Sequence, residues 1–132
     1  MTSTDELDDI RESKREQLIS EQDGAESPDE PVQVDSPDHF QELVDTYDVA
    51  LVDFYADWCG PCIALGEFIG EVAAETDAAV LKVNVDQQQQ LAGQFGVQSI
   101  PNMLVFKDGE PVQRLVGLKD KSELVAAVEA AA

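Results

Sequence analysis

Trp58-Cys59-Gly60-Pro61-Cys62 stands between an apolar run, Val49–Ala56, and a segment with apolar residues at helical spacing, Ile63–Ala74. The run predicts a buried strand, and the segment after it predicts a helix. The two cysteines, which are the only ones in the chain, are therefore expected where a strand is followed by the N-terminus of a helix.

A Cys-x-x-Cys sequence at that position favours redox chemistry. Unpaired N–H groups and the helix dipole stabilise an anion there, so we expect the Cys59 thiolate to be stabilised. The first turn brings Cys62 close enough to bond Cys59, while Gly60 lets another chain approach and Pro61 fixes the first-turn angle without needing a donor. The sequence thus predicts Cys59 as the exposed nucleophile and Cys62 as the buried resolving thiol.

The cysteine pair has two other interpretations. A structural zinc site needs four ligands, and only His39 and carboxylates remain to complete one, so we expect no bound metal. A pair of inert core thiols fits poorly with a Cys-Gly-Pro-Cys sequence at a strand–helix junction.

The composition is globular and strongly acidic. The chain has 132 residues, enough for one domain with a real core, and its 28 Asp and Glu against 8 Lys and Arg give a formal net charge of −20. Nucleic-acid binding needs a basic patch and an anionic membrane attracts positive charge, so we expect neither partner. Carboxylates spread along the whole chain favour a salt-loving host, such as a halophilic archaeon; the alternative is a surface that keeps a mesophilic protein in solution.

The sequence also bears on the compartment. No apolar run approaches the roughly 20 residues of a membrane span. Residues 1–6 lack the basic region and the apolar core of a signal peptide. We therefore expect a cytoplasmic protein, and a reducing cytosol disfavours a purely structural disulfide.

Residues 1–31 are an acidic N-terminal extension with 11 acids and 3 bases. Leu7, Ile10 and Leu18 fall roughly on one helical face, which predicts a short helix near residues 4–20. So few apolar groups do not offset an ordering entropy of about 1–2 kcal/mol per residue, so the extension is predicted to be mostly disordered. A docking helix for a partner is the alternative.

Residues 32–132 alternate strand and helix patterns. The predicted strands cover residues 32–34, 49–56, 79–85, 102–106 and 112–116, and the predicted helices cover residues 37–47, 59–75, 86–95 and 119–131. Asp86 is expected to cap the third helix, and Asp108-Gly109 predicts a hairpin turn. Strands joined by helices should be parallel and the closing hairpin antiparallel, which predicts an α/β fold with one mixed sheet and helices on both faces.

Several motifs are similar to those of a known family. Val52-Asp53-Phe54-Tyr55-Ala56-Asp57-Trp58-Cys59-Gly60-Pro61-Cys62 resembles the active-site segment of the thioredoxin family. Further matches follow in the right order: Lys82 and Asp86, Ser99-Ile100-Pro101, Phe106–Glu110, and Val116-Gly117. The resemblance covers residues 32–132 and implies a thioredoxin fold for that domain.

The resemblance also implies roles for individual residues. Asp53 would lie buried beneath the cysteines and assist proton transfer, with Lys82 as its possible partner. Pro101 would form a cis peptide bond that sets the Ile100 backbone beside the sulfurs, where it can pair with an extended substrate. Together with Ile100 and Pro101, a contact surface around Cys59 would be formed by Trp58, Gly60, Pro61 and Gly117.

Four positions depart from the family pattern. Glu67 stands where many members carry a helix-kinking proline, which predicts a straighter helix. Ile63 replaces a usual lysine, Asn102 a common threonine and Tyr55 a common tryptophan. None of these changes removes a group that the reaction needs.

The resulting functional hypothesis is a monomeric, cytoplasmic thiol–disulfide oxidoreductase that reduces disulfides in partner proteins. The resemblance implies that a separate thioredoxin reductase recharges the Cys59–Cys62 pair and that no cofactor is bound. The alternatives are a binding or assembly subunit that docks through its N-terminal segment, and an oxidant or isomerase of folding proteins. The cytosolic interpretation and the Gly-Pro dipeptide disfavour the latter.

Overall fold

Strand β2 (Val49–Tyr55) is the centre of a five-stranded sheet in the computed structural model, which describes residues 26–132. The helix expected near residues 4–20 lies outside the described residues. Strand β3 (Ala79–Asn84) pairs with β2 in parallel, and β4 (Asn102–Lys107) pairs with its other edge in antiparallel. Both faces of β2 are buried, as its apolar pattern, interrupted only by Asp53, predicts.

Two further strands complete the sheet. Strand β1 (Val32–Gln33) runs parallel to β3, and β5 (Glu110–Val116) forms an antiparallel hairpin with β4, giving the order β1-β3-β2-β4-β5. The expected mixed sheet, with its parallel strands and its antiparallel closing hairpin, is confirmed.

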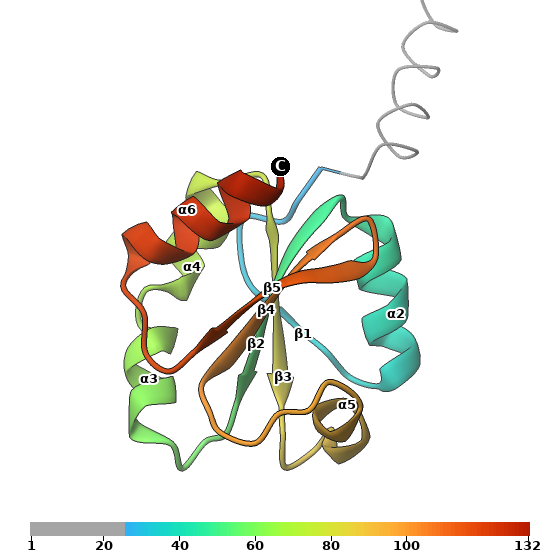
Figure 1. Ribbon diagram of the computed structural model, residues 1–132, viewed down its shortest axis with the longest axis vertical. Helices are drawn as coiled ribbons and strands as arrows, with labels where there is room; N and C mark the ends of the chain where they lie inside the picture. Colours follow the sequence, from blue (N-terminus) through green and yellow to red (C-terminus); the bar gives the residue numbers. More distant parts are fainter. Residues whose placement is uncertain (1–25) are drawn as a thin grey trace, which may run out of the picture.

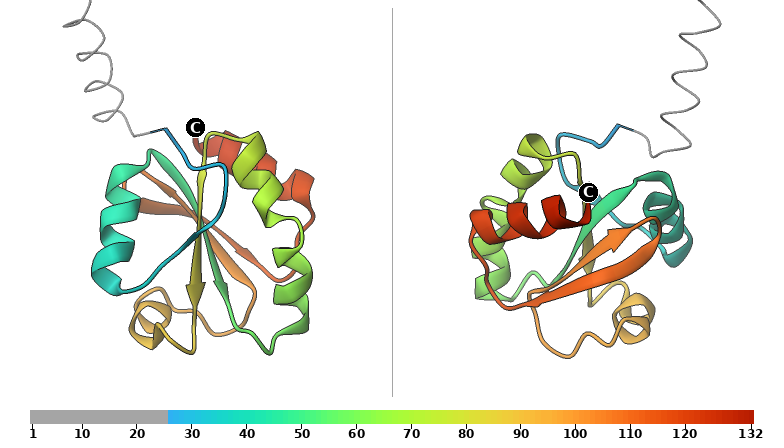
Figure 2. Two further views of the ribbon diagram at one scale, coloured as in Figure 1. Left: turned by 180° about the vertical axis from the view of Figure 1, so that it is seen from behind. Right: turned by 45° about the horizontal axis from the view of Figure 1, so that its top comes forward.

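Helices cover both faces of the sheet (Figures 1 and 2). Helices α2 (Pro37–Thr46) and α5 (Gln89–Gln94) lie on one face, where Phe40, Val44 and Leu91 join the buried cluster around Val52 and Phe54. The other face carries α3 (Gly60–Gly66), α4 (Ile69–Glu75) and α6 (Lys121–Ala131), whose inward residues pack on a second buried cluster. Within residues 26–132 no helix is both long and apolar enough to cross a membrane.

Local hydrogen bonds fix the starts of α2 and α6. The side chain of Ser36 accepts the N–H of His39 at 3.0 Å and Pro37 occupies the first turn, as predicted. Helix α6 begins two residues later than expected because the carboxylate of Asp120 caps it, accepting the N–H of Glu123 at 2.9 Å.

The predicted continuous helix over residues 59–75 is wrong. The segment is divided into α3 and α4, and at the junction the N–H groups of Glu67 and Phe68 donate to carbonyls only three residues back. Phe68 leaves the helical conformation and packs, partly buried, against the cluster on the sheet face that carries α3, α4 and α6. Gly66 and Gly70 flank the break and are weak helix formers, so the helix bends without the proline that Glu67 replaces.

The predicted cap of α5 by Asp86 is also wrong. Helix α5 begins only at Gln89, and the side chain of Asn84 accepts the N–H groups of Asp86 and Gln87 at 2.9 and 3.2 Å. Asn84 is buried and so placed at the end of β3 that it closes the following turn. The carboxylate of Asp86 is thereby left available for a contact outside its own turn.

The hairpin turn between β4 and β5 holds two residues in the left-handed backbone region. Asp108 and Gly109 both have positive φ, of 51° and 84°, and a Cβ at Gly109 would lie 3.1 Å from Oδ1 of Asp45. We expect Gly109→Ala to lower the free energy of unfolding by about 1–2 kcal/mol, because an L side chain is strained at that φ.

Gly93→Ala is the matched control for this prediction. A Cβ at Gly93 in α5 would meet nothing within 4 Å, so the same substitution should raise the free energy of unfolding by about 0.5–1 kcal/mol. Chemical unfolding measures the free energy of unfolding of both variants. An equal change in the two would contradict the assignment of strain to Gly109.

Candidate active site

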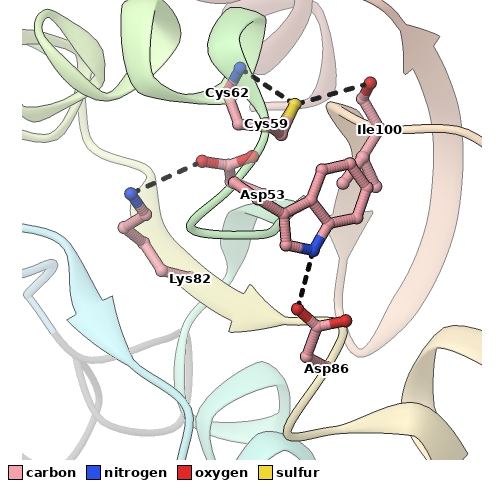
Figure 3. The surroundings of a disulfide bond; sticks show 7 residues. Asp53, Cys59, Cys62, Lys82, Asp86 and Ile100 are labelled. Carbon is pink, nitrogen blue, oxygen red and sulfur yellow. Dashed lines mark hydrogen bonds and ion pairs between the residues drawn. A yellow bond between two sulfur atoms is a disulfide. The ribbon is translucent and has the colours of Figure 1, made fainter.

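Cys59 and Cys62 form a disulfide at the point where β2 is followed by α3. Cys59 is the N-cap of α3 and Cys62 lies in its first turn, with 5.2 Å between their Cα atoms. The main-chain N–H of Cys62 donates to Sγ of Cys59 at 3.2 Å (Figure 3). A donor directed at that sulfur stabilises negative charge on it in the reduced state.

The two cysteines differ little in exposure. Cys59 is 5% exposed and Cys62 is 3% exposed, so the expected contrast between an exposed and a buried thiol is absent from the disulfide form. Both pack in a small cluster with Ala56, against which Tyr55 and Ile100 are partly buried. Access to Cys59 therefore depends on what covers this cluster.

Asp53 lies fully buried in β2, and its side chain points toward the cysteines (Figure 3). Neither of its carboxylate oxygens has a hydrogen-bond partner among the described residues. The ammonium of Lys82, on the neighbouring β3, lies 3.9 Å from Oδ2. Burial raises the pKa of Asp53 to about 6, and the positive charge of Lys82 acts in the opposite direction.

The ammonium of Lys82 is partly covered by its neighbours. It lies 4.3 Å from the centre of the Tyr55 ring, and a Cβ at Gly66 would lie 3.7 Å from it. The hydroxyl of Tyr55 donates to the side chain of Gln33 at 3.1 Å, which fixes the ring. This contact of Tyr55 was not predicted from the sequence, although the two-residue spacing from Asp53 places both side chains on one face of the strand.

Ile100 and Pro101 lie beside the disulfide. The Ile100–Pro101 peptide bond is cis, and the carbonyl oxygen of Ile100 is 3.8 Å from Sγ of Cys59 (Figure 3). The N–H of Gly117 donates to the carbonyl of Pro101 at 2.8 Å, which connects the end of β5 to the same segment. The structure thus brings together Cys59, Ile100, Pro101 and Gly117 from three distant parts of the sequence.

Trp58 is 71% exposed, which excludes it from the core. Its indole N–H donates to the carboxylate of Asp86 at 2.9 Å, so the side chain left free at the end of β3 orients this ring. Gly60 and Pro61 are exposed next to it on the surface. In residues 26–132 no three His, Cys, Asp or Glu side chains are grouped so that they could hold a metal ion.

Sequence comparisons agree with this geometry. The family profile described as Thioredoxin matches residues 31–130. A thioredoxin of Chlamydia muridarum is 46% identical over 95 residues, which cover 71% of this chain and 92% of that protein. A thioredoxin of Staphylococcus saprophyticus is 46% identical over 83 residues, covering 61% of this chain and 80% of that protein.

Solved structures extend the comparison to the fold. A mutant thioredoxin of Halobacterium salinarum NRC-1 superposes with a TM-score of 0.78 at 44% identity, over 82% of this chain and 96% of that chain. A Plasmodium falciparum thioredoxin gives a TM-score of 0.71 at 31% identity, over 76% of this chain and 99% of that chain. With its Cys59–Cys62 pair at a strand–helix junction, the chain belongs to the thioredoxin family and is a protein thiol–disulfide oxidoreductase.

Proposed function

We propose that this oxidoreductase works as a reductase of disulfides in partner proteins, with Cys59 as the attacking thiolate. The observation that carries the assignment is the N–H of Cys62 directed at Sγ of Cys59, which stabilises a thiolate at that sulfur. The sulfur of Cys62 accepts no corresponding main-chain N–H among the described residues. The two thiols therefore differ in the ease with which each forms an anion.

The reaction transfers two electrons in two exchange steps. The Cys59 thiolate attacks one sulfur of the substrate disulfide, forming a mixed disulfide and releasing the other substrate sulfur as a thiolate. The Cys62 thiolate then attacks Sγ of Cys59, which releases the second substrate thiol and leaves the Cys59–Cys62 disulfide. A separate reductase returns the two electrons, so the chain needs no bound cofactor.

Asp53 is proposed to accept the proton of the Cys62 thiol. A carboxylate whose pKa is raised by burial to about 6 is poised to exchange protons near neutral pH. Lys82, at 3.9 Å, keeps the charged form of Asp53 from becoming prohibitively costly in the buried site. Asp53 thus serves as general base and Lys82 as its electrostatic partner.

Substrates are proposed to bind along the surface formed by Trp58, Gly60, Pro61, Ile100, Pro101 and Gly117. The main chain of Ile100 lies beside Cys59 and is suited to pair with an extended segment that carries a disulfide. Trp58 supplies exposed apolar area next to the sulfur.

The wider setting is part of the same proposal. A monomer in the cytoplasm, served by a thioredoxin reductase, agrees with the family and with a surface too acidic to favour nucleic acid or anionic membrane. The acidic composition also favours a halophilic host. The N-terminal extension, residues 1–31, is proposed to take no part in disulfide exchange.

Replacement of each cysteine by serine is expected to stop the reaction at a different step. Cys62→Ser should still attack a substrate but should accumulate a covalent mixed disulfide, because the resolving thiol is gone. Cys59→Ser should lose turnover and form no such adduct. Mass spectrometry of each variant with a disulfide-bonded protein measures the adduct, and partner capture that survives in Cys59→Ser would instead support a binding subunit.

Asp53→Asn is expected to change the pH dependence of stability. The pKa of Asp53 is higher in the folded chain than the 3.8 of its ordinary state, so the folded state binds more protons and the wild type loses stability as pH rises from about 4 to about 6. The variant lacks this loss. Its free energy of unfolding relative to wild type should therefore rise by up to about 3 kcal/mol over that interval and stay level above it.

Urea unfolding at a series of pH values measures this difference. In parallel, the variant should reduce protein disulfides at least about tenfold more slowly at pH 7, because it cannot take a proton from Cys62. Asp57→Asn is the control, since Asp57 is exposed at the end of the same segment. A pH-independent difference in stability would show that Asp53 is ionised throughout and would remove the proton-transfer role.

The direction of electron flow is tested by the potential of the Cys59–Cys62 pair. Equilibration with a dithiothreitol buffer in molar salt should give a value near −270 mV, the approximate potential of a strong disulfide reductant of this type. A value above about −180 mV would instead indicate an oxidant or isomerase.

A further inference from the structure

Arg114 connects the two ends of the segment that carries Ile100. It lies on β5 and is the single arginine of residues 26–132. One guanidinium nitrogen, Nη1, donates to Oδ1 of Asn102 at 2.9 Å, and the other, Nη2, donates to the carbonyl oxygen of Phe95. Phe95 is the C-terminal cap of α5 and Asn102 is the first residue of β4, so one side chain holds both boundaries of residues 96–101.

The segment between these boundaries has few other fixed points. The N–H groups of Gly96 and Val97 donate to the carbonyls of Gly93 and Ala92 at 3.2 and 2.9 Å, and the carbonyl of Pro101 accepts from Gly117 at 2.8 Å. The side chain of Ile100 packs, partly buried, against the cysteine cluster. Within the described part of the chain, Gln98 and Ser99 make no main-chain hydrogen bond, and both are exposed. The placement of Ile100 therefore depends strongly on how the two ends are held.

Arginine is suited to this contact for a geometric reason. Its planar guanidinium directs two N–H groups at two acceptors at once, whereas an ammonium is a single point charge on a flexible stem. Asn102 is 3% exposed, so its amide oxygen would be buried without this donor, and an unpaired buried acceptor is costly. The departure from threonine at position 102 thus has a partner twelve residues away on the adjacent strand.

We propose that Arg114 is a positioning residue for substrate recognition, which holds the Ile100 segment in place for main-chain pairing with a disulfide-bearing polypeptide. The proposal rests on the reductase function proposed above and adds to it a residue that touches neither sulfur. The proposal predicts different effects on two classes of substrate. A polypeptide disulfide pairs with the Ile100 main chain, whereas a small disulfide without peptide groups does not.

The test compares Arg114→Ala and Arg114→Lys with Lys107→Gln. Lys107 lies on the same hairpin and forms an ion pair with Asp48 at 2.8 Å, so its substitution removes one paired charge at a distance from Asn102. Each variant is assayed with insulin as the polypeptide disulfide and dithiothreitol as electron donor. For the small disulfide, each variant is first reduced with dithiothreitol and freed of it, and its single-turnover reaction with DTNB is then followed, because dithiothreitol reduces DTNB directly. Amide hydrogen exchange of Val97 is measured in parallel.

For Arg114→Ala we expect KM for insulin to rise about three- to tenfold, while kcat for insulin and the DTNB rate change by less than about twofold, because only the ordering of the binding segment is lost. Amide exchange at Val97, whose N–H is hydrogen-bonded to Ala92, should quicken by a similar factor. In Arg114→Lys the insulin KM should lie between the values of Arg114→Ala and the wild type, since one ammonium does not direct two N–H groups at two acceptors as the planar guanidinium does. Lys107→Gln should match the wild type in both assays.

Other outcomes would overturn the proposal. Each of three outcomes would exclude a positioning role. An unchanged insulin KM in Arg114→Ala would show that the side chain has no effect, and an equal loss with insulin and DTNB would show general damage to the protein. Full rescue by Arg114→Lys would show that only the positive charge matters. A wild-type chain that reduces insulin no faster than dithiothreitol alone would refute the reductase function itself, and the Arg114 proposal with it. The two failures are therefore distinguishable.

Discussion

The pairing of β2 with β3 on one edge and β4 on the other is the constraint on which the site depends. Because β2 is buried on both faces and bonded along both edges, its end has a fixed position. Each neighbour delivers one component there: β3 places Lys82 opposite Asp53, and β4 begins directly after Ile100 and Pro101. The helix that starts after β2 then sets both cysteines above this junction. The sheet thus brings Lys82, Ile100 and Pro101 from distant parts of the sequence to the segment that runs from Asp53 to Cys62.

The same constraint makes Asp53 costly. A carboxylate in the middle of a central strand, without a hydrogen-bond partner in the described structure, destabilises the fold once it ionises. Replacement by an apolar residue would remove that penalty, as well as the group able to exchange a proton near neutral pH. Lys82, held between the Tyr55 ring and Gly66, reduces the cost without removing it. The buried carboxylate therefore lowers the stability of the fold, a cost that agrees with the proton-transfer role proposed for Asp53.

Much of the fold could be predicted from the sequence because its signals are local. The apolar run of β2, the Ser36-Pro37 start of α2 and the Asp108-Gly109 turn each depend on a few adjacent residues, and the structure has all three. The division between α3 and α4 depends instead on Phe68 packing against a cluster that includes α6, which is far along the chain. Glycines on either side permitted the break but did not require it. The absence of proline at position 67 was therefore a poor guide to a straight helix.

The site divides in the same way. The Cys59–Cys62 spacing and the buried Asp53 are visible as patterns, since a Cys-x-x-Cys pair opens a helix and a carboxylate interrupts an apolar strand. The contacts of Asp86 and Arg114 are not. On a strand or a turn, a charged residue has the same sequence pattern whether it is solvated or bound to a group far along the chain. Alternation assigns Arg114 a face of β5, but only the hairpin register, which pairs Leu104 with Arg114 and Asn102 with Val116, brings the guanidinium within reach of Asn102. Residues that orient a reactive group from a neighbouring strand are thus recognised only once strand order and register are known.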